Sequence, residues 1–521
     1  MPPNRIQGAA CRQGGADDPR YPGSRVRDKR RGFRLGARPP PACLIRTGTR
    51  AVPITLAVDF GSTYTKVVAI DCDDELLVGV AQSPTTVGEG VMIGLERALA
   101  RLEAASGVKR GDITRSVASS SAAGGLRMVA IGLVPDLTAE AARRAALGAG
   151  AKVLRAFAYE LSRRDLDQLA RLAPDMILLS GGTDGGERKT LIRNASALAA
   201  ARLQAPIVVA GNRAAEDEVE AILSQAGLDC TIVENVLPEL DRLNVEPARA
   251  AIRSIFMNRI THAKGLDQAE AFVGRIVMPT PMAVLEAARL LAAGDSGAGM
   301  GDLVVVDVGG ATTDVHSIGS GAPSTPGLVP RGLPEPFAKR TVEGDLGIRV
   351  NAPTIVETAG IARVVSGLGE RMNADQILAR VRQLAVEVDR VPREETEHDL
   401  DAVLAGLAVD TALERHAGQV TTSYTPMGPV QLLHGKDLST VATVIGTGGV
   451  FAYGRHPRRM LQAACYRPES PASLRPRDPA LLIDRRYILF AVGLLAQIAP
   501  RAAANVMRRH LTKAEDVCDV V

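Results

Sequence analysis

The sequence is poor in aromatic residues. It has no Trp, and Phe, Trp and Tyr together make up only 3% of its 521 residues. Proteins that hold single-stranded nucleic acid stack bases on such rings, so their scarcity argues against a nucleic-acid partner. Long apolar runs are also missing. The clearest one, residues 487–498 (YILFAVGLLAQI), is too short to cross a bilayer. It predicts a buried C-terminal helix, and no membrane partner is expected.

Cysteine and histidine patterns exclude two further classes. The six Cys are scattered and form no CxxC pair. This is typical of a protein in a reducing cytoplasm rather than of a disulfide framework. The seven His form no HxxxH pair and do not cluster with Cys, which argues against a protein-held zinc site.

The positive charge is concentrated at the N-terminus. Residues 1–50 hold eleven Arg and one Lys against three Asp, a net +9, so the formal charge of +4 leaves −5 for the remaining 471 residues. This segment is rich in Arg, Pro and Gly without hydrophobic periodicity, and we expect it to be disordered. An over-extended start codon explains it as well as a function does. The length of 521 residues predicts two to four domains.

The stretch Leu56–Val67 reads LAVDFGSTYTKV. An apolar strand ends at Asp59 and breaks into a turn made of the small residues Gly61, Ser62 and Thr63. Glycine lets the backbone of such a hairpin approach a ligand closely, and the hydroxyls offer donors. Lys66 offers a positive charge for phosphate, and Asp59 suits a magnesium ion held mainly through waters. A single hairpin of this kind is weak evidence, because many hairpins carry Asp and Gly at their turns.

A second copy strengthens the prediction. Residues 303–315, LVVVDVGGATTDV, again place an apolar strand before an aspartate, Asp307. Glycines and hydroxyls follow as Gly309, Gly310, Thr312 and Thr313. Two such hairpins about 250 residues apart suggest an internal duplication with two halves facing one phosphate chain. A third element, residues 443–451, opens a β-branched strand into Gly446, Gly448 and Gly449. Such a glycine bend lets a base and ribose lie on the backbone.

In this order the three motifs resemble those of the actin/Hsp70/sugar-kinase superfamily of ATPases, as phosphate-1 (59–66), phosphate-2 (307–314) and adenosine (445–450). The resemblance implies an α/β fold, a duplicated actin-like ATPase (ribonuclease H-like) fold with two lobes around a nucleotide cleft. It implies ATP and Mg²⁺ as cofactors and Asp59, Asp307 and Thr312 as catalytic residues. Asp59 and Asp307 would hold the metal through water, and Asp314 is a further candidate.

A glycine loop narrows the resemblance. The buried strand 176–179 runs into residues 181–186, GGTDGG, and then into a helix near 189–201. Such a loop is either a phosphate cradle or a tight turn, and it lacks the GK[ST] ending of a Walker A loop. Together with the other motifs it is similar to the MutL/GlmL family, encoded alongside adenosylcobalamin-dependent glutamate mutase and distinct from the mismatch-repair protein of similar name. The resemblance covers about residues 53–511.

We predict a first half over residues 51–300 and a second half over 301–511. A helical insertion at 373–416, beginning with the capping pair Asn373 and Gln376, is either a partner surface or a structural lid. In Hsp70-like relatives the helix connecting the halves carries a carboxylate that positions magnesium and water. Here residues 278–281 read MPTP, and Glu286 lies two turns later. At most a slow ATPase is therefore expected.

Three functions remain open. The family resemblance implies a chaperone-like reactivating factor whose partners are subunits of an adenosylcobalamin-dependent mutase, with glutamate (methylaspartate) mutase as the expected one. A small-molecule kinase of the sugar type would share the nucleotide motifs but needs a carboxylate base, for which Asp184 is the Gly-flanked candidate. A hydantoinase- or oxoprolinase-like ATP-dependent hydrolase shares the second motif, but no nucleophile or metal-ligand constellation accompanies it.

Overall fold

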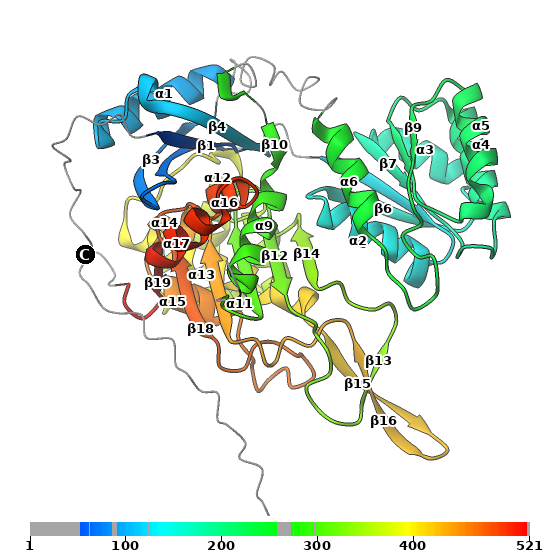
Figure 1. Ribbon diagram of the computed structural model, residues 1–521. Helices are drawn as coiled ribbons and strands as arrows, with labels where there is room; N and C mark the ends of the chain where they lie inside the picture. Colours follow the sequence, from blue (N-terminus) through cyan, green and yellow to red (C-terminus); the bar gives the residue numbers. More distant parts are fainter. Residues whose placement is uncertain are drawn as a thin grey trace, which may run out of the picture. The chain divides into compact units, whose positions relative to one another are not determined.

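The computed structural model describes residues 53–61, 63–85, 91–121, 126–257, 272–274, 276–294, 297 and 299–517 (Figure 1). The chain divides into two contact units, residues 1–50 and 51–521, and all described residues belong to the second. The predicted disorder of residues 1–50 and the predicted role of Ser62 therefore lie outside the described residues.

The first sheet contains the first phosphate hairpin. Its members are β1 (Ile54–Phe60), β2 (Tyr64–Asp71), β3 (Leu76–Pro84), β4 (Ile113–Ser120) and β10 (Ile276–Pro279). The strand order is β10-β4-β1-β2-β3, in which β1, β2 and β3 are antiparallel and β4 runs parallel to β1 and β10. All seven residues of β1 are buried. This burial explains why the strand reads as a continuous apolar run rather than an alternating one. Helix α1 (Val91–Ser106) packs against β2 and β3.

The second sheet repeats this plan. Its strands are β11 (Leu303–Val308), β12 (Thr313–Ile318), β14 (Ala338–Glu343), β17 (Thr443–Thr447), β18 (Ala480–Asp484) and β19 (Leu511–Lys513). Their order is β14-β12-β11-β17-β18-β19. An antiparallel meander (β11, β12, β14) is again extended by two parallel strands beside its first member, with β19 added at the edge. The repeated order supports the predicted duplication.

An apolar cluster joins the two sheets. Helices α9 (Thr280–Ala293), α16 (Leu489–Leu495) and α17 (Pro500–His510) share it with residues of β1, β2, β11 and β18. All seven residues of α16 are buried, which confirms the predicted buried C-terminal helix. Within the part of the chain that the structure describes, no helix has the length and apolarity to span a membrane.

Residues 126–257, which we call the inserted domain, form a separate parallel sheet between β4 and β10 in sequence. Its strands are β5 (Arg127–Gly132), β6 (Lys152–Ala158), β7 (Met176–Leu179), β8 (Ile207–Val209) and β9 (Cys230–Ile232), in the order β6-β5-β7-β8-β9. Helices α2 (Glu140–Gly148) and α6 (Glu246–Ile255) cover one face. Helices α3 (Arg163–Leu172), α4 (Lys189–Ala201) and α5 (Glu216–Gln225) cover the other. The alternating βαβ pattern predicted helices on both faces, but the sequence interpretation counted this sheet within the first half.

The helices that follow the second hairpin are α10 (Ala352–Ala359), α11 (Ile361–Gly367), α12 (Ala374–Val386) and α13 (Glu395–His416). The capping box is confirmed, because Asn373 Oδ1 accepts the Gln376 amide at 2.9 Å and Gln376 Oε1 accepts the Asn373 amide at 2.9 Å. Helix α13 contacts β11, β12 and β14, and most of its residues are buried. It is therefore a scaffold helix along most of its length, which leaves little of it to serve as a partner surface.

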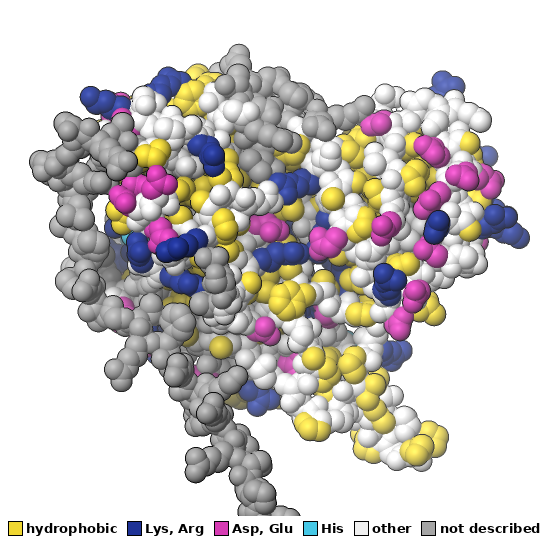
Figure 2. Space-filling view, viewed as in Figure 1, with side chains coloured by type: hydrophobic (Ala, Val, Ile, Leu, Met, Phe, Trp, Pro, Cys, Tyr) yellow, Lys and Arg dark blue, Asp and Glu magenta, His cyan; other side chains and the backbone are white. Residues whose placement is uncertain are grey.

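A small third layer completes the described chain. Strands β13 (Leu328–Arg331), β15 (Gln419–Thr425) and β16 (Gly428–His434) form a sheet in the order β13-β16-β15. Hydrophobic side chains lie over the β15–β16 hairpin in Figure 2, and Tyr424 and Met427 near its turn are 84% and 99% exposed. Helices α14 (Gly449–Tyr453) and α15 (Pro457–Gln462) follow β17.

Candidate functional site

Two aspartates occupy equivalent positions in the two sheets. Asp59 and Asp307 are each the next-to-last residue of the first strand of their sheet, β1 and β11. Across the hairpin, Asp59 pairs with Lys66 and Asp307 pairs with Asp314. The sheets thus present the same hairpin with different charges opposite the aspartate, a lysine in one and a carboxylate in the other.

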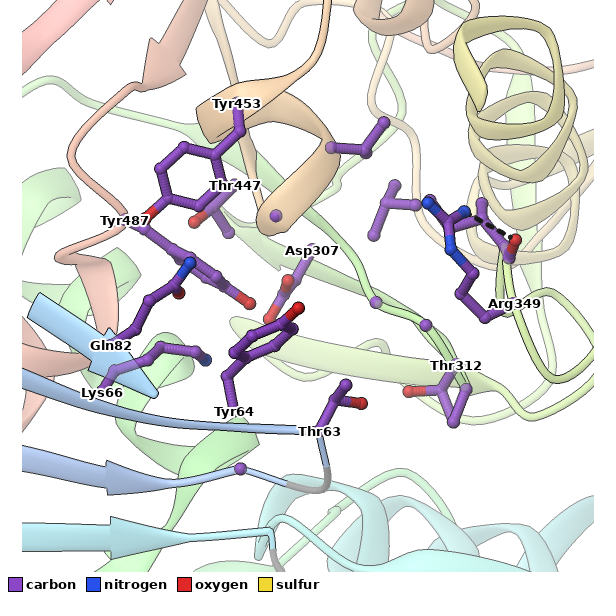
Figure 3. Close-up of a pocket in the computed structure, with 18 of the residues that line it drawn as sticks. Thr63, Tyr64, Lys66, Gln82, Asp307, Thr312, Arg349, Thr447, Tyr453 and Tyr487 are labelled. Carbon is purple, nitrogen blue, oxygen red and sulfur yellow. Dashed lines mark hydrogen bonds between the residues drawn. The ribbon is translucent and has the colours of Figure 1, made fainter. Parts of the chain in front are cut away.

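A cavity of about 370 Å³ is lined by both hairpins. Figure 3 shows Thr63, Tyr64 and Lys66 on the side of the first hairpin, with Asp307 and Thr312 facing them. A methyl group built on Gly310 would lie 3.8 Å from Thr63 Oγ1, so the two hairpin turns lie close together. The volume is within the range of small-molecule sites in proteins.

Asp59 is fully buried and surrounded by donors. Lys66 Nζ donates to Asp59 Oδ2 at 2.7 Å, and Ser119 Oγ and Thr280 Oγ1 donate to Oδ1 at 3.1 and 2.5 Å. Burial by itself lowers the pKa of Lys66, but the Asp59 carboxylate, followed by Tyr487, more than offsets this and raises that pKa above its usual value. The lysine is therefore charged. Because it forms an ion pair with Asp59, its positive charge is not fully available to the phosphate for which the sequence predicted it.

Asp307 faces a carboxylate across its hairpin, whereas Asp59 faces a lysine. Burial, followed by repulsion from the Asp314 carboxylate, raises the pKa of Asp307 to about 7. Asp314 accepts a hydrogen bond from Thr312 Oγ1 at 3.1 Å and from Arg340 Nε at 2.9 Å. A cation placed beside these two carboxylates would relieve their mutual repulsion. Among the described residues, no group of three or more His, Cys, Asp or Glu could hold a metal ion.

Of the three glycines of the third motif, Gly449 lines the cavity, whereas Gly446 and Gly448 do not. A methyl group on Gly449 would meet nothing within 4 Å, whereas one on Gly448 would lie 2.3 Å from the Val308 carbonyl oxygen. Gly448 also has a φ of 107°, a conformation that other residues rarely adopt. Gly448 therefore brings the third motif against β11, and Gly449 leaves open space beside the cavity. Gly446 packs against the ring of Phe451.

The cavity brings most of the predicted residues together. It is lined by Asp59, Gly61, Thr63, Lys66, Asp307, Gly309, Gly310, Thr312, Asp314 and Gly449. Thr313 does not line it, since its buried hydroxyl donates to the Leu346 carbonyl at 2.7 Å. Alternation along β12 turns this side chain away from its neighbours Thr312 and Asp314.

Two further candidates, Glu286 and Asp184, lie outside the lining. Glu286 is 3.8 Å from Arg289 on the same helix. Asp184 is exposed and accepts from Asn235 Nδ2 at 2.9 Å and from the Arg213 amide at 3.1 Å. The buried Asn212 also donates to the carbonyls of Gly186 and Glu187, both at 3.1 Å. These contacts support the interpretation of GGTDGG as a tight turn.

Several lining residues carry no signal in the sequence. Thr280 lies in the segment 278–281, which has no carboxylate, and its hydrogen-bond partner Asp59 is 221 positions away in the sequence. The Tyr487 ring lies 4.1 Å from Lys66 Nζ, and its backbone has a φ of 53°. Arg349 points toward the cavity in Figure 3 while its guanidinium bonds both carboxylate oxygens of Asp401, at 2.9 and 2.6 Å. A composition or spacing rule could not have found these partners, because each arises from contacts between distant segments.

The repeated strand order and the cavity between equivalent hairpins define a duplicated actin-like fold of the ATPase and sugar-kinase type, as predicted. The sequence matches the family described as MutL protein over residues 55–511, and the chain belongs to this family. It is 47% identical over 459 residues to the Protein MutL of Clostridium tetanomorphum, covering 88% of this chain and 99% of that protein. The predicted family is therefore confirmed.

Solved structures show more distant likeness. A diol dehydratase-reactivating factor in nucleotide-free form is 11% identical, with a TM-score of 0.34 over 86% of this chain and 100% of that one. The xylulose kinase from Bifidobacterium adolescentis is also 11% identical, with a TM-score of 0.31 over 89% of this chain and 96% of that one. These values are too low to bear on function.

Proposed function

We propose that the cavity binds Mg-ATP and that the protein is an accessory or reactivating factor for an adenosylcobalamin-dependent mutase, with glutamate mutase as the partner. The observation that carries the nucleotide assignment is the pair of equivalent hairpins facing one cavity with Asp59 and Asp307 at its base. Membership of the MutL family supports the mutase partner. The free Cys72, Cys230 and Cys465 among the described residues support a cytoplasmic location.

The residues of the cavity fit magnesium and a phosphate chain. Asp307 and Asp314 would face the ion, usually through water, and the backbone at Gly309 and Gly310 with the Thr312 hydroxyl would bind phosphate oxygens. Bound magnesium would neutralise phosphate charge. Lys66, paired with Asp59, would keep the first hairpin electrically balanced rather than supply a free charge.

Hydrolysis in the isolated protein is expected to be slow. The connecting helix α9 begins with Thr280, whose hydroxyl donates to Asp59. In Hsp70-like relatives this helix carries a carboxylate that positions water. A neutral threonine hydroxyl is a much weaker general base than a carboxylate. Turnover of ATP at many per second without a partner would contradict this expectation.

Thermal unfolding with and without Mg-ATP tests the assignment. At a nucleotide concentration of about 100 times Kd, binding should stabilise the wild type by about 2.7 kcal/mol. The Asp307→Ala variant should lose this stabilisation, whereas Asp184→Ala, which removes an exposed aspartate outside the cavity, should keep it. Undiminished stabilisation of Asp307→Ala would reject the cavity as the nucleotide site. No contact among the described residues supports the kinase or the hydrolase alternative.

The mutase partner needs its own test. Immobilised protein would be incubated with glutamate mutase subunits in the presence of Mg-ATP, Mg-ADP or no nucleotide. A reactivating factor works by binding its partner with different affinity in different nucleotide states. We therefore expect the captured amount of mutase to change by at least about fivefold between two of the three states. Equal capture in all three would reject the nucleotide-controlled role.

A further inference from the structure

One turn of the inserted domain lies against elements that support the cavity. Helix α2 ends at Gly148, and residues 149–151 lead into β6. The amide of Ala149 bonds the Ala145 carbonyl at 3.0 Å, and the amide of Ala151 bonds that of Ala146 at 3.1 Å. The turn is therefore an ordered end of the helix, with buried carbonyl groups at the negative end of the helix dipole.

Arg340 joins this turn to the cavity. Its Nη1 donates to the carbonyls of Leu147 at 2.9 Å and Ala151 at 2.8 Å. Its Nε and Nη2 lie 2.9 and 2.6 Å from Asp314 Oδ1. Asp314 lines the cavity and also accepts from Thr312 in the second phosphate loop. One buried guanidinium is thus shared between a carboxylate of the candidate site and the end of α2.

The same turn also contacts the junction of β10 and α9, which lies beside the first hairpin. A methyl group built on Gly150 would lie 3.0 Å from Pro279 Cβ and 3.3 Å from Met282 Cβ. Between those two residues stands Thr280, whose hydroxyl donates to Asp59. Residues 148–151 therefore lie against the segments that hold both Asp59 and Asp314, one from each hairpin.

Other contacts dock the inserted domain without reaching the cavity. Arg144 on α2 donates to the Pro334 carbonyl and to Glu335 Oε1, both at 2.8 Å. Neither partner lines the cavity. Arg144 and Arg340 thus bind the same helix to the second half, but only Arg340 touches a cavity residue. This difference provides a matched control.

We propose that Arg340 is a positioning residue that couples the occupancy of the cavity to the inserted domain through the α2–β6 turn. This inference rests on the proposed binding of Mg-ATP. When a cation and phosphate occupy the cavity, Asp314 and Thr312 gain new partners, and the share of the guanidinium held by Asp314 changes. The guanidinium of Arg340 also donates through Nη1 to the Leu147 and Ala151 carbonyls, so a change in its contact with Asp314 also changes its hold on the α2–β6 turn. The inserted domain, rather than the largely buried α13, then presents the nucleotide state to the mutase.

Hydrogen exchange measured by mass spectrometry tests the coupling in the full-length protein. Saturating Mg-ATP should slow exchange of the amides of residues 149–151 in the wild type by about fivefold or more. Arg340→Lys keeps the charge, but its donors all sit on one nitrogen and cannot span from Asp314 to the α2 carbonyls as the planar guanidinium does. It should bind Mg-ATP by calorimetry with little change in affinity and should lose the slowing. Arg144→Gln should retain it.

The outcomes separate this inference from the proposed function. A wild type that does not bind Mg-ATP in calorimetry rejects the proposed function. A wild type that binds without slowed exchange at 149–151 rejects only the coupling. Slowing that persists in Arg340→Lys, slowing that is lost equally in Arg144→Gln, or nucleotide binding that Arg340→Lys abolishes also overturns it.

If Arg340→Lys does not fold, a second variant tests the coupling by changing the cavity-side partner of Arg340, which is Asp314. Asp314→Asn keeps the shape of the side chain and removes its charge. At nucleotide concentrations that saturate this variant in calorimetry, the slowing at residues 149–151 should be absent. Slowing of the wild-type size in Asp314→Asn would overturn the role of the Asp314–Arg340 contact.

Discussion

Replacing Lys66 by Met should destabilise the protein, because it leaves the Asp59 carboxylate buried without a cation. The two charged atoms lie 2.7 Å apart, and the side chains are 11% and 0% exposed. Removing one partner of a buried ion pair typically costs about 3–5 kcal/mol. Asp59 keeps its hydrogen bonds from Ser119 and Thr280. We therefore expect the lower end, a fall of about 3 kcal/mol in the free energy of unfolding.

A double-mutant cycle measures the pair itself. Urea unfolding would be followed by circular dichroism for the wild type, Lys66→Met, Asp59→Asn and the double variant. Because the isosteric amide carries no charge, the double variant should lose less than the two single variants combined, with a coupling of about 2 kcal/mol. The exposed pair Arg110–Glu96, whose side chains are 59% and 49% exposed, is the matched control and should couple by less than about 1 kcal/mol.

The cycle can refute the reasoning. If the two single losses add within about 0.5 kcal/mol, Lys66 and Asp59 do not stabilise each other as the buried geometry requires. A coupling no larger than that of the Arg110–Glu96 control would lead to the same conclusion. In that case the lysine charge would be available for phosphate, as the sequence pattern first indicated.

Gly448→Ala should abolish stabilisation by Mg-ATP, because its methyl group would lie 2.3 Å from the Val308 carbonyl oxygen and displace the third motif. The methyl group of Gly449→Ala would meet no atom within 4 Å, so this variant should fold normally. Equal thermal shifts with nucleotide in the wild type and Gly448→Ala would contradict this. Lys436 is fully buried, with Nζ bonded to the carbonyls of Ser317, Pro336 and Phe337. Burial, followed by the nearby Lys339, lowers the pKa of Lys436 to about 7. Above that pH the unfolded chain binds a proton that the folded one does not, so stability should rise with pH by up to about 1.4 kcal/mol per unit, until the pH nears the unfolded-state pKa of about 10.4. Lys436→Met should lack this rise, and parallel pH profiles of the two proteins between about pH 7 and 9 would refute it.

Local sequence determined the elements that bear the site. An apolar run, an aspartate and a glycine within a few residues specify a strand and its turn, so both hairpins, Asp59 to Lys66 and Asp307 to Asp314, were predictable. The capping box at Asn373 and the buried helix 489–495 were predictable for the same reason. In each case the signal is local, because the interacting groups are near neighbours in the chain or because a short continuous apolar run marks an element that is buried on all sides.

Tertiary structure alone decided how those elements are used. The pairing of Asp59 with Thr280, 221 positions apart, and of Arg340 with the end of α2, 193 positions from Leu147, depends on which strands become neighbours. The same holds for the separate parallel sheet of the inserted domain, whose strands resemble any other buried strands in sequence. Long-range contacts are set by the packing of whole elements, and local patterns of hydrophobicity carry no information on which side chain from a distant segment will meet a given carboxylate.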